Sequence, residues 1–171
     1  MTKATDVRRI ERQKGQRGHL VLGLVSCSAQ KLDRPAPARQ LYTSPLFRLS
    51  LAYAEARCDH VYVLSAFHDV LELDQRIDPY DWRLGSKRER EAWAFRVANR
   101  VVPRHGRDAH YVILAGNDYA RPLYAALHMH GGCNSYGYLG VPFAQIHEPL
   151  RGKQIGQRLR WLKDQSGRSA A

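Results

Sequence analysis

The sequence predicts a single-domain α/β fold, a doubly wound and mostly parallel sheet of about four strands flanked by helices. Four apolar runs of strand length alternate with stretches of helical periodicity, which is the pattern of successive βα units. Each apolar run ends in small polar or reactive residues. With 171 residues, 44% of them hydrophobic, the chain is long enough to bury one sizeable core.

The strands are assigned from short continuous apolar runs, because strands of a parallel sheet are buried on both faces. In the first run, five of the six residues before the terminal serine are Leu or Val. The other three runs have the same apolar character. Strands are therefore expected at about 20–26, 61–65, 110–115 and 141–147.

The helices are assigned from periodicity together with start and stop signals. Ser44 suits a helix N-cap, and Pro45 suits the first helical position. Ser86 and Glu89 have the spacing of a capping box, and Pro103 is expected to end the helix that they begin. Helices are therefore expected at about 44–57, 86–102, 119–130 and 153–165.

Three segments between these elements are expected to be loops. Residues 32–41 contain two prolines and suggest extended chain, while residues 67–85 show no sustained period. A segment rich in Gly, Tyr and Asn follows Gly131 as far as Gly140. The second of these loops is long, and long ordered loops are often functional.

The basic charge of the chain is concentrated at its two ends. The net charge is +11, of which residues 1–19 carry +4 and residues 151–171 carry +5. Basic ends favour polyanionic partners, although they also improve solubility. We expect a flexible basic arm at 1–18, the α/β domain at 19–165 and a flexible tail at 166–171. The expected nucleic-acid contacts in the last helix are Arg158, Arg160 and Lys163.

Several classes of protein are disfavoured by what the sequence lacks. It has no apolar run near the ~20 residues that cross a bilayer and no apolar signal core after Met1, so no membrane association is expected. Its three cysteines have no paired spacing, which suits a reducing cytoplasm. Without a CxxC motif, a Walker loop or a GxGxxG loop, neither a metal nor another cofactor is expected.

The polar residues that follow the four strands are expected to form one pocket. In a parallel sheet the carboxyl ends of the strands share one edge, and ligands bind in the crevice outside that edge. The candidate residues at these strand ends are Ser26, Cys27, Ser28, Ser65, His68, Gly116, Asn117, Asp118, Tyr119 and His147.

Each of these candidates has a functional and a purely structural interpretation. Cys27 is a nucleophile if a base lowers its pKa, or else a small thiol in a capped turn. His68 and His147 suit acid–base chemistry, or are loop histidines without a role. Asn117 can hold a base edge and Asp118 a water, or the two residues begin a helix through a tight turn.

A proline turn in the segment 67–85 adds aromatic candidates. Tyr80 lies between two aspartates, and Trp82 follows closely. In a basic protein either ring can stack on a nucleobase. Alternatively, the ring packs inward and fixes the loop.

Several of these motifs resemble an uncharacterised bacterial and phage domain family that is related to the YaaA peroxide-stress proteins. The likeness covers about residues 20–163, and its motifs occur in order. They are Val25-Ser26-Cys27-Ser28 with Lys31-Leu32-Asp33, Leu41-Tyr42-Thr43-Ser44-Pro45-Leu46-Phe47, Val63-Leu64-Ser65-Ala66 with His68, Pro79-Tyr80-Asp81, Ala115-Gly116 with Tyr119, Pro149-Leu150, Ile155-Gly156 and Trp161-Leu162.

The resemblance implies an α/β domain associated with DNA or modified bases. It also implies a fold like that of uracil-DNA glycosylases and of a domain of archaeal tRNA-guanine transglycosylases. Lys31 and Tyr42 belong to its motifs and are added to the expected substrate contacts. One departure stands out, because relatives usually have a Gly-Leu pair where this chain has Asp69-Val70.

The function expected from these observations is DNA glycosylase-like base excision, a nucleic-acid-directed reaction at a nucleobase or its N-glycosidic bond. Ser26, Cys27 and Ser28 would contact the base or sugar-phosphate, Asn117 or Asp118 would position water, and His68 would stabilise charge on the departing base. Two alternatives are a non-catalytic DNA-binding stress-response module and an enzyme that acts on free nucleotides or deoxyribonucleosides. The favoured partner is DNA rather than RNA.

Overall fold

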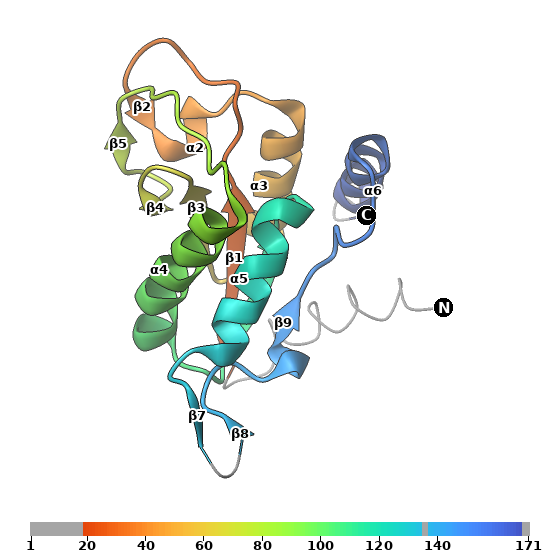
Figure 1. Cartoon of the computed structure of the whole chain (residues 1–171). Coiled ribbons are helices and arrows are strands. Elements are labelled where there is room, and N and C mark those ends of the chain that lie inside the picture. Colours follow the sequence, from red (N-terminus) through yellow and green to blue (C-terminus); the bar gives the residue numbers. More distant parts are fainter. Residues whose placement is uncertain (1–18, 135–136, 169–171) are drawn as a thin grey trace.

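The computed structural model describes residues 19–134 and 137–168 (Figure 1). A five-stranded sheet in the order β4-β3-β1-β6-β9 forms its centre. Four of these strands are parallel, as expected, and β4 runs antiparallel to β3 at one edge. The strands are β1 (Val21–Ser26), β3 (His60–Ser65), β4 (Asp69–Glu72), β6 (His110–Leu114) and β9 (Ile146–His147).

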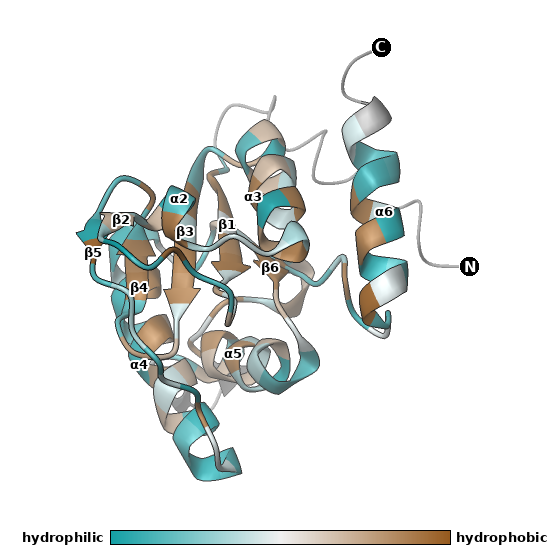
Figure 2. Ribbon diagram, turned by 90° about the horizontal axis from the view of Figure 1, so that it is seen from above, coloured by the Kyte–Doolittle hydropathy of each residue, from teal (hydrophilic) through white to brown (hydrophobic). Residues whose placement is uncertain are grey.

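Helices cover both faces of the sheet, which confirms the doubly wound arrangement (Figure 2). Val21 and Val25 of β1 pack towards α3 and α6, whereas Leu22 and Leu24 pack towards α4 and α5. Alternate residues of a strand point to opposite faces, so β1 is buried on both sides. The helices are α3 (Pro45–Arg57), α4 (Lys87–His105), α5 (Asn117–Met129) and α6 (Ile155–Arg168).

The helix α3 lies very close to β1 at Gly23. A Cβ atom at this position would be 2.9 Å from the Cβ of Ala54 and 3.2 Å from the Sγ of Cys58. A glycine is therefore needed here for space, not for backbone conformation. This close approach holds the last turn of α3 against the middle of β1.

The order of the strands creates a switch point between β1 and β6. The chain leaves β1 through α3 on one face and leaves β6 through α5 on the other. Because β1 and β6 are neighbours, the two connections diverge and leave a crevice outside their carboxyl ends. The sequence prediction of a binding edge therefore applies best to these two strands.

Both loops expected before α4 contain regular structure instead. The segment 67–85 holds β4 and also β5 (Arg76–Ile77). The segment 32–41 holds β2 (Ala36–Pro37), which pairs with β5, and the short helix α2 (Ala38–Leu41). These elements are two to four residues long, too short to produce a periodic pattern in the sequence.

The fourth expected strand, at 141–147, is mostly irregular. Only Ile146 and His147 form β9, and they pair with Tyr111 and Val112 of β6. The residues before them form a 3₁₀ helix, Phe143–Gln145, after Pro142. A small hairpin of β7 (Cys133–Asn134) and β8 (Gly137–Tyr138) lies in the expected loop before this segment.

The helix signals are largely confirmed. The Oγ of Ser44 accepts a hydrogen bond from the backbone N of Phe47, and Ser86 with Glu89 forms both bonds of the capping box. Pro103 lies within the last turn of α4, which continues to His105. The helix therefore does not end at Pro103. Its hydrogen bonding continues past the proline, because the backbone N of Gly106 donates to the carbonyl of Val102.

The ends of the chain are described only in part. The helix α5 begins at Asn117, and α6 continues through Arg168, past the expected boundary at Gln165. The expected arm at 1–18 and the end of the expected tail, 169–171, lie outside the described residues. Within the described ranges, no helix has the length and apolar composition needed to cross a membrane.

Candidate functional site

A crevice of about 400 Å³ lies outside the carboxyl ends of β1 and β6. It brings together most of the polar residues expected at the first and third strand ends. Three further polar side chains come from α3 and α6. The polar and small residues of its lining are Ser26, Cys27, Ser28, Ser44, Ser50, Gly116, Asn117, Asp118, Tyr119 and Arg158.

The N-terminus of α5 forms one side of this crevice. Gly116 is its N-cap and supplies no side-chain cap, while its carbonyl accepts from the backbone N of Tyr119 and of Ala120. Asn117 and Asp118 occupy the exposed first turn. The amino end of a helix is favourable for anions, because its first N–H groups and its dipole point outward.

Arg158 of α6 reaches the same point from the other side. Its Nε donates to the carbonyl of Lys153 at 2.7 Å, and its Nη2 is 3.4 Å from the Oδ1 of Asn117. A Cβ atom at Gly116 would be 3.5 Å from Nη1. The guanidinium is thus held against the start of α5, where it adds a full positive charge to the helix terminus.

The end of β1 supplies hydroxyl and thiol groups to the crevice. Ser26 Oγ makes one long hydrogen bond, 3.3 Å, to the carbonyl of Cys27, and Ser28 Oγ donates to the carbonyl of Gln30 at 2.9 Å. The backbone N of Cys27 donates to the carbonyl of Leu64 at 2.8 Å. The N–H of Cys27 is therefore used by the sheet, while the hydroxyls of Ser26 and Ser28 and the thiol of Cys27 line the crevice.

The end of β3 forms a separate group, because a turn leads directly into the antiparallel strand β4. Ser65 Oγ accepts from the backbone N of Phe67 at 3.1 Å and of His68 at 2.9 Å. With both lone pairs used, its proton is left for the hydroxyl of Tyr80, 2.8 Å away. Ser65, His68 and Tyr80 do not line the crevice, contrary to the expectation of a single pocket.

The hydroxyl chain continues from Tyr80 to Tyr42. The two phenol oxygens are 2.8 Å apart, and Lys31 Nζ lies 4.5 Å from the centroid of the Tyr80 ring. Burial raises the pKa of Tyr42 to about 12 and also raises the pKa of Tyr80, with the nearby Cys27 acting in the same direction. Both phenols are therefore protonated at neutral pH. Lys31 and Tyr42 belong to this group and not to the lining of the crevice.

His68 packs against the aromatic rings of this second group. Its ring lies edge-on to Tyr80, with the centroids 5.3 Å apart. Burial lowers its pKa from the usual value, so the ring is mainly neutral at pH 7. Its carbonyl oxygen accepts from Arg100 at 3.2 Å.

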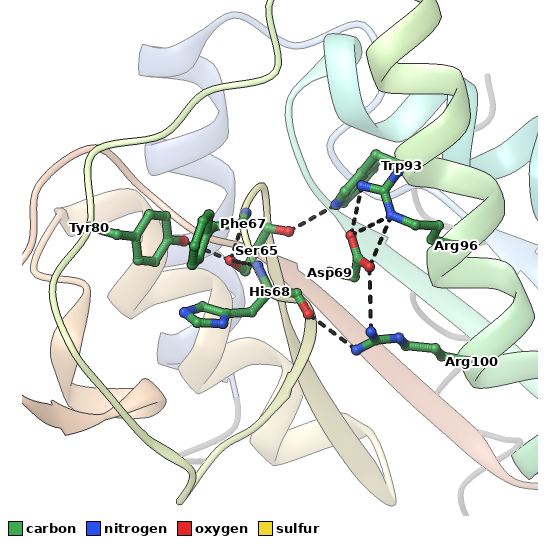
Figure 3. A network of polar contacts seen from close by, with 8 residues as sticks. All are labelled: Ser65, Phe67, His68, Asp69, Tyr80, Trp93, Arg96 and Arg100. Atoms are coloured by element: carbon green, nitrogen blue, oxygen red, sulfur yellow. Dashed lines mark hydrogen bonds and ion pairs between the residues drawn. The ribbon is translucent and has the colours of Figure 1, made fainter.

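The turn after β3 depends on Asp69, which has a left-handed backbone with φ of 62° (Figure 3). This conformation is one that glycine adopts more readily than aspartate. The Asp69 carboxylate is bound on both oxygens by Arg96, at 3.0 and 3.1 Å, and lies 3.6 Å from Arg100. Sequence reasoning missed these arginines, although the replacement of glycine was a signal that a compensating contact exists.

The remaining candidates lie elsewhere. His147 is buried, with its Nε2 3.0 Å from the Nδ1 of His110, because β9 pairs with the first half of β6 and not with its carboxyl end. Burial raises the pKa of the adjacent Glu148, which is paired with Arg151 at 3.3 Å. Arg160 and Lys163 are exposed on α6 and do not line the crevice. Among the described residues, no three His, Cys, Asp or Glu side chains are grouped to hold a metal.

Comparisons with known proteins give a family but no activity. A comparison with curated proteins finds no match. The likeness to the YaaA peroxide-stress proteins and to uracil-DNA glycosylases is not tested by this result and stays a prediction. Residues 22–164 match the model of a family of unknown function, DUF6884. This match covers most of the 171 residues, and the chain therefore belongs to the DUF6884 family.

Proposed function

We propose that the crevice between β1 and β6 binds one nucleotide unit of DNA and hydrolyses its N-glycosidic bond. The observation that carries the proposal is the meeting of three groups at one point. These are the hydroxyls that follow β1, the Asn117-Asp118 pair at the start of α5, and the guanidinium of Arg158. The volume of about 400 Å³ is within the range of small-molecule sites.

The charges around the crevice suit a phosphate-bearing ligand. Arg158 and the N-terminus of α5 favour an anion at the same place. The net charge of +11 favours a polyanion over a free nucleotide. We therefore expect DNA as the partner, in the cytoplasm, with Arg160 and Lys163 adding phosphate contacts from the exposed face of α6.

The reaction follows from the position of the carboxylate. Asp118, with Asn117 beside it, would orient a water whose oxygen attacks C1′ of the sugar, and the carboxylate would take up the water's proton. The electrons of the C1′–N bond leave with the base, which is then protonated by solvent. Ser26 and Ser28 would bind the sugar or the base. His68 does not line the crevice, so its expected contact with the departing base is not part of this proposal.

Base release is the direct test. Duplex and single-stranded DNA containing uracil, hydroxymethyluracil, or oxidised or enlarged bases would be incubated with the protein, and free base measured by mass. Replacing Asp118 or Asn117 by Ala should reduce release by roughly 10²-fold or more, as does loss of other positioned catalytic groups. DNA affinity should change little, because phosphate contacts dominate it. Asp108→Ala, at an exposed aspartate outside the crevice, is the matched control and should have no effect.

The two alternative functions give different results in the same assay. Tight, salt-dependent DNA binding without release of any base would favour the non-catalytic module. Release from free deoxyribonucleosides, combined with salt-independent and weak DNA binding, would favour an enzyme on small substrates. Equal activity of Asp118→Ala and Asp108→Ala would contradict the proposed mechanism.

A further inference from the structure

Two large aromatic side chains are unusually exposed beside the turn that follows β3. The side chain of Phe67 in this turn is 58% exposed, and that of Trp82 in the following segment is 53% exposed. Their ring centroids are 6.5 Å apart. By contrast, Trp93, directly behind the turn, is fully buried. A pair of exposed rings on one surface is a feature that needs an explanation.

The rings lie on a rigid base. Phe67 stacks on Tyr80, with centroids 5.4 Å apart and ring planes 28° apart, and Figure 3 shows both side chains beside Ser65. Tyr80 is fixed through its hydroxyl by Ser65 and Tyr42. The backbone of the turn is fixed by the Oγ of Ser65. The Phe67 half of the aromatic surface is therefore held in place by the protein itself, and Trp82 contacts it through the Phe67 ring.

The charged groups near these rings favour a base more than a phosphate directly above them. Lys31 lies over the Tyr80 ring and supplies a cation at the border of the surface. Two exposed aspartates, Asp78 and Asp81, flank Tyr80 in the chain and would repel a phosphate placed at the rings, and the exposed Arg83 next to Trp82 offsets this repulsion only in part. An uncharged, flat and polarisable group such as a nucleobase avoids this repulsion and can stack on the open ring face.

The surface is connected to the crevice through the sheet. The end of β3, which carries the turn, is hydrogen-bonded to the end of β1 through Leu64 and Cys27. Cys27, which lines the crevice, also interacts electrostatically with Tyr80 beneath Phe67, so the crevice and the aromatic surface are neighbouring parts of one sheet edge. A base can stack there only when it is not paired in a duplex.

We propose that Phe67 and Trp82 form a stacking platform for an unpaired nucleobase, so that the protein prefers single-stranded or locally opened DNA. This inference rests on the nucleic-acid partner of the proposed function but not on cleavage. Tyr80 supports the platform from below, and Lys31 neutralises a phosphate at its border. The platform thus selects the form of the substrate, while the crevice acts on one nucleotide.

Binding of a short oligothymidylate, compared with a duplex of the same length, tests the platform. The full-length protein would be titrated by fluorescence anisotropy. Quenching of tryptophan emission would be recorded in parallel and compared with that of Trp82→Phe, because Trp93 is buried and Trp161 is only partly exposed. We expect Phe67→Ala and Trp82→Ala each to weaken single-strand binding by roughly 5- to 100-fold. Duplex binding should change much less. Trp82→Phe retains a ring and should restore most of the affinity.

Phe143→Ala is the matched control, since Phe143 is a phenylalanine with 57% exposure in the 3₁₀ helix before β9 and lies outside the lining of the crevice, and it should bind as the unaltered protein does. The inference is overturned if both platform variants bind single strands normally, if they lose single-strand and duplex binding equally, or if the unaltered protein binds neither DNA. If binding depends on the platform but no base is released, only the cleavage proposal is contradicted. Base release with unchanged strand preference in the variants would overturn the platform alone.

Discussion

Ser26 and Ser65 end two neighbouring parallel strands, yet their hydroxyls have opposite roles. Ser26 Oγ is half-buried, faces the crevice and makes one long hydrogen bond of 3.3 Å. Ser65 Oγ is fully buried and bonded to two backbone N–H groups and a tyrosine. A serine at the end of a strand thus has hydrogen-bonding capacity left for a ligand in β1, whereas in β3 all of this capacity is taken up by the protein.

This difference separates the carboxyl edge of the sheet into two regions. Around β1 and β6, polar side chains are available to a ligand, so substitutions there should change binding or rate with little effect on stability. Around the end of β3, polar groups are satisfied inside the protein, so substitutions of these polar groups should change stability first. Substitutions in the two regions should therefore have different effects.

The largest effect on stability should come from Ser65→Ala. It removes the acceptor of the Phe67 and His68 N–H groups and the partner of Tyr80, and should lower the free energy of unfolding by about 2 kcal/mol. Ser26→Ala is the matched control and should cost less than about 0.5 kcal/mol. Urea unfolding followed by circular dichroism measures both. Equal losses in the two variants would remove the distinction between the regions.

The next effect concerns affinity at the crevice. Arg158→Ala should weaken DNA binding about tenfold, because it removes the cation that is held against the start of α5. Arg160→Ala, on the same helix but exposed, should weaken binding only slightly and mainly at low salt. Anisotropy titrations at several salt concentrations distinguish the two. A larger loss for Arg160→Ala would assign binding to the outer face of α6.

A smaller effect is expected from two substitutions of Asp69. Asp69→Ala loses the bonds to Arg96 and keeps a side chain at a φ of 62°. Asp69→Gly loses the same bonds but relieves the backbone, so it should be about 1 kcal/mol more stable than Asp69→Ala. Thermal unfolding of both variants is the measurement. An alanine variant as stable as the glycine variant would mean that the turn does not require the left-handed conformation.

The smallest effect should be a loss of stability in mild acid. Burial lowers the pKa of His105 and of His68, and for His105 the nearby His60 and Arg104 add to the shift. Because the folded protein holds these rings neutral, the unfolded chain binds more protons below the usual histidine pKa of about 6.5, and stability falls as the pH drops through that range. A protonated His105 Nε2 could only donate to the Tyr62 hydroxyl oxygen, 2.8 Å away, and could no longer accept a proton from it.

The measurement is urea unfolding at pH 7.5 and 5.5. His105→Gln with His68→Asn should show a smaller loss between the two pH values than the unaltered protein, and an unchanged loss would exclude these two histidines as the source. His60→Gln removes a partly exposed histidine of the same cluster and should reduce the loss only in part.

Much of the fold could be predicted from the sequence because its strongest signals are local. Ser44 and Ser86 cap their helices as expected, and the three long strands lie within a residue of their predicted positions. The strand β4 was missed because its turn has no glycine, and the left-handed residue is an aspartate stabilised by side chains from α4. Contacts between residues this far apart leave no periodic pattern.

The candidate site could be predicted where the chain leaves a parallel strand for a helix on one face of the sheet. Cys27, Asn117 and Asp118 come together because β1 and β6 are parallel neighbours. Ser65 and His68 do not join them, because β3 turns back at once into an antiparallel partner. Arg158 could be identified only as a basic residue of the last helix, since its place at Asn117 depends on how α6 packs against α3.

The pairing of Asp69 with α4 also has an evolutionary consequence. An aspartate in this left-handed position is favourable only where an arginine already stands at position 96, and with glycine at 69 that arginine has no carboxylate to bind. The two positions should therefore show epistasis, so that a change at either one is tolerated or harmful according to the residue at the other. In a collection of related sequences, glycine at 69 should accompany free variation at 96, and aspartate should accompany a retained arginine.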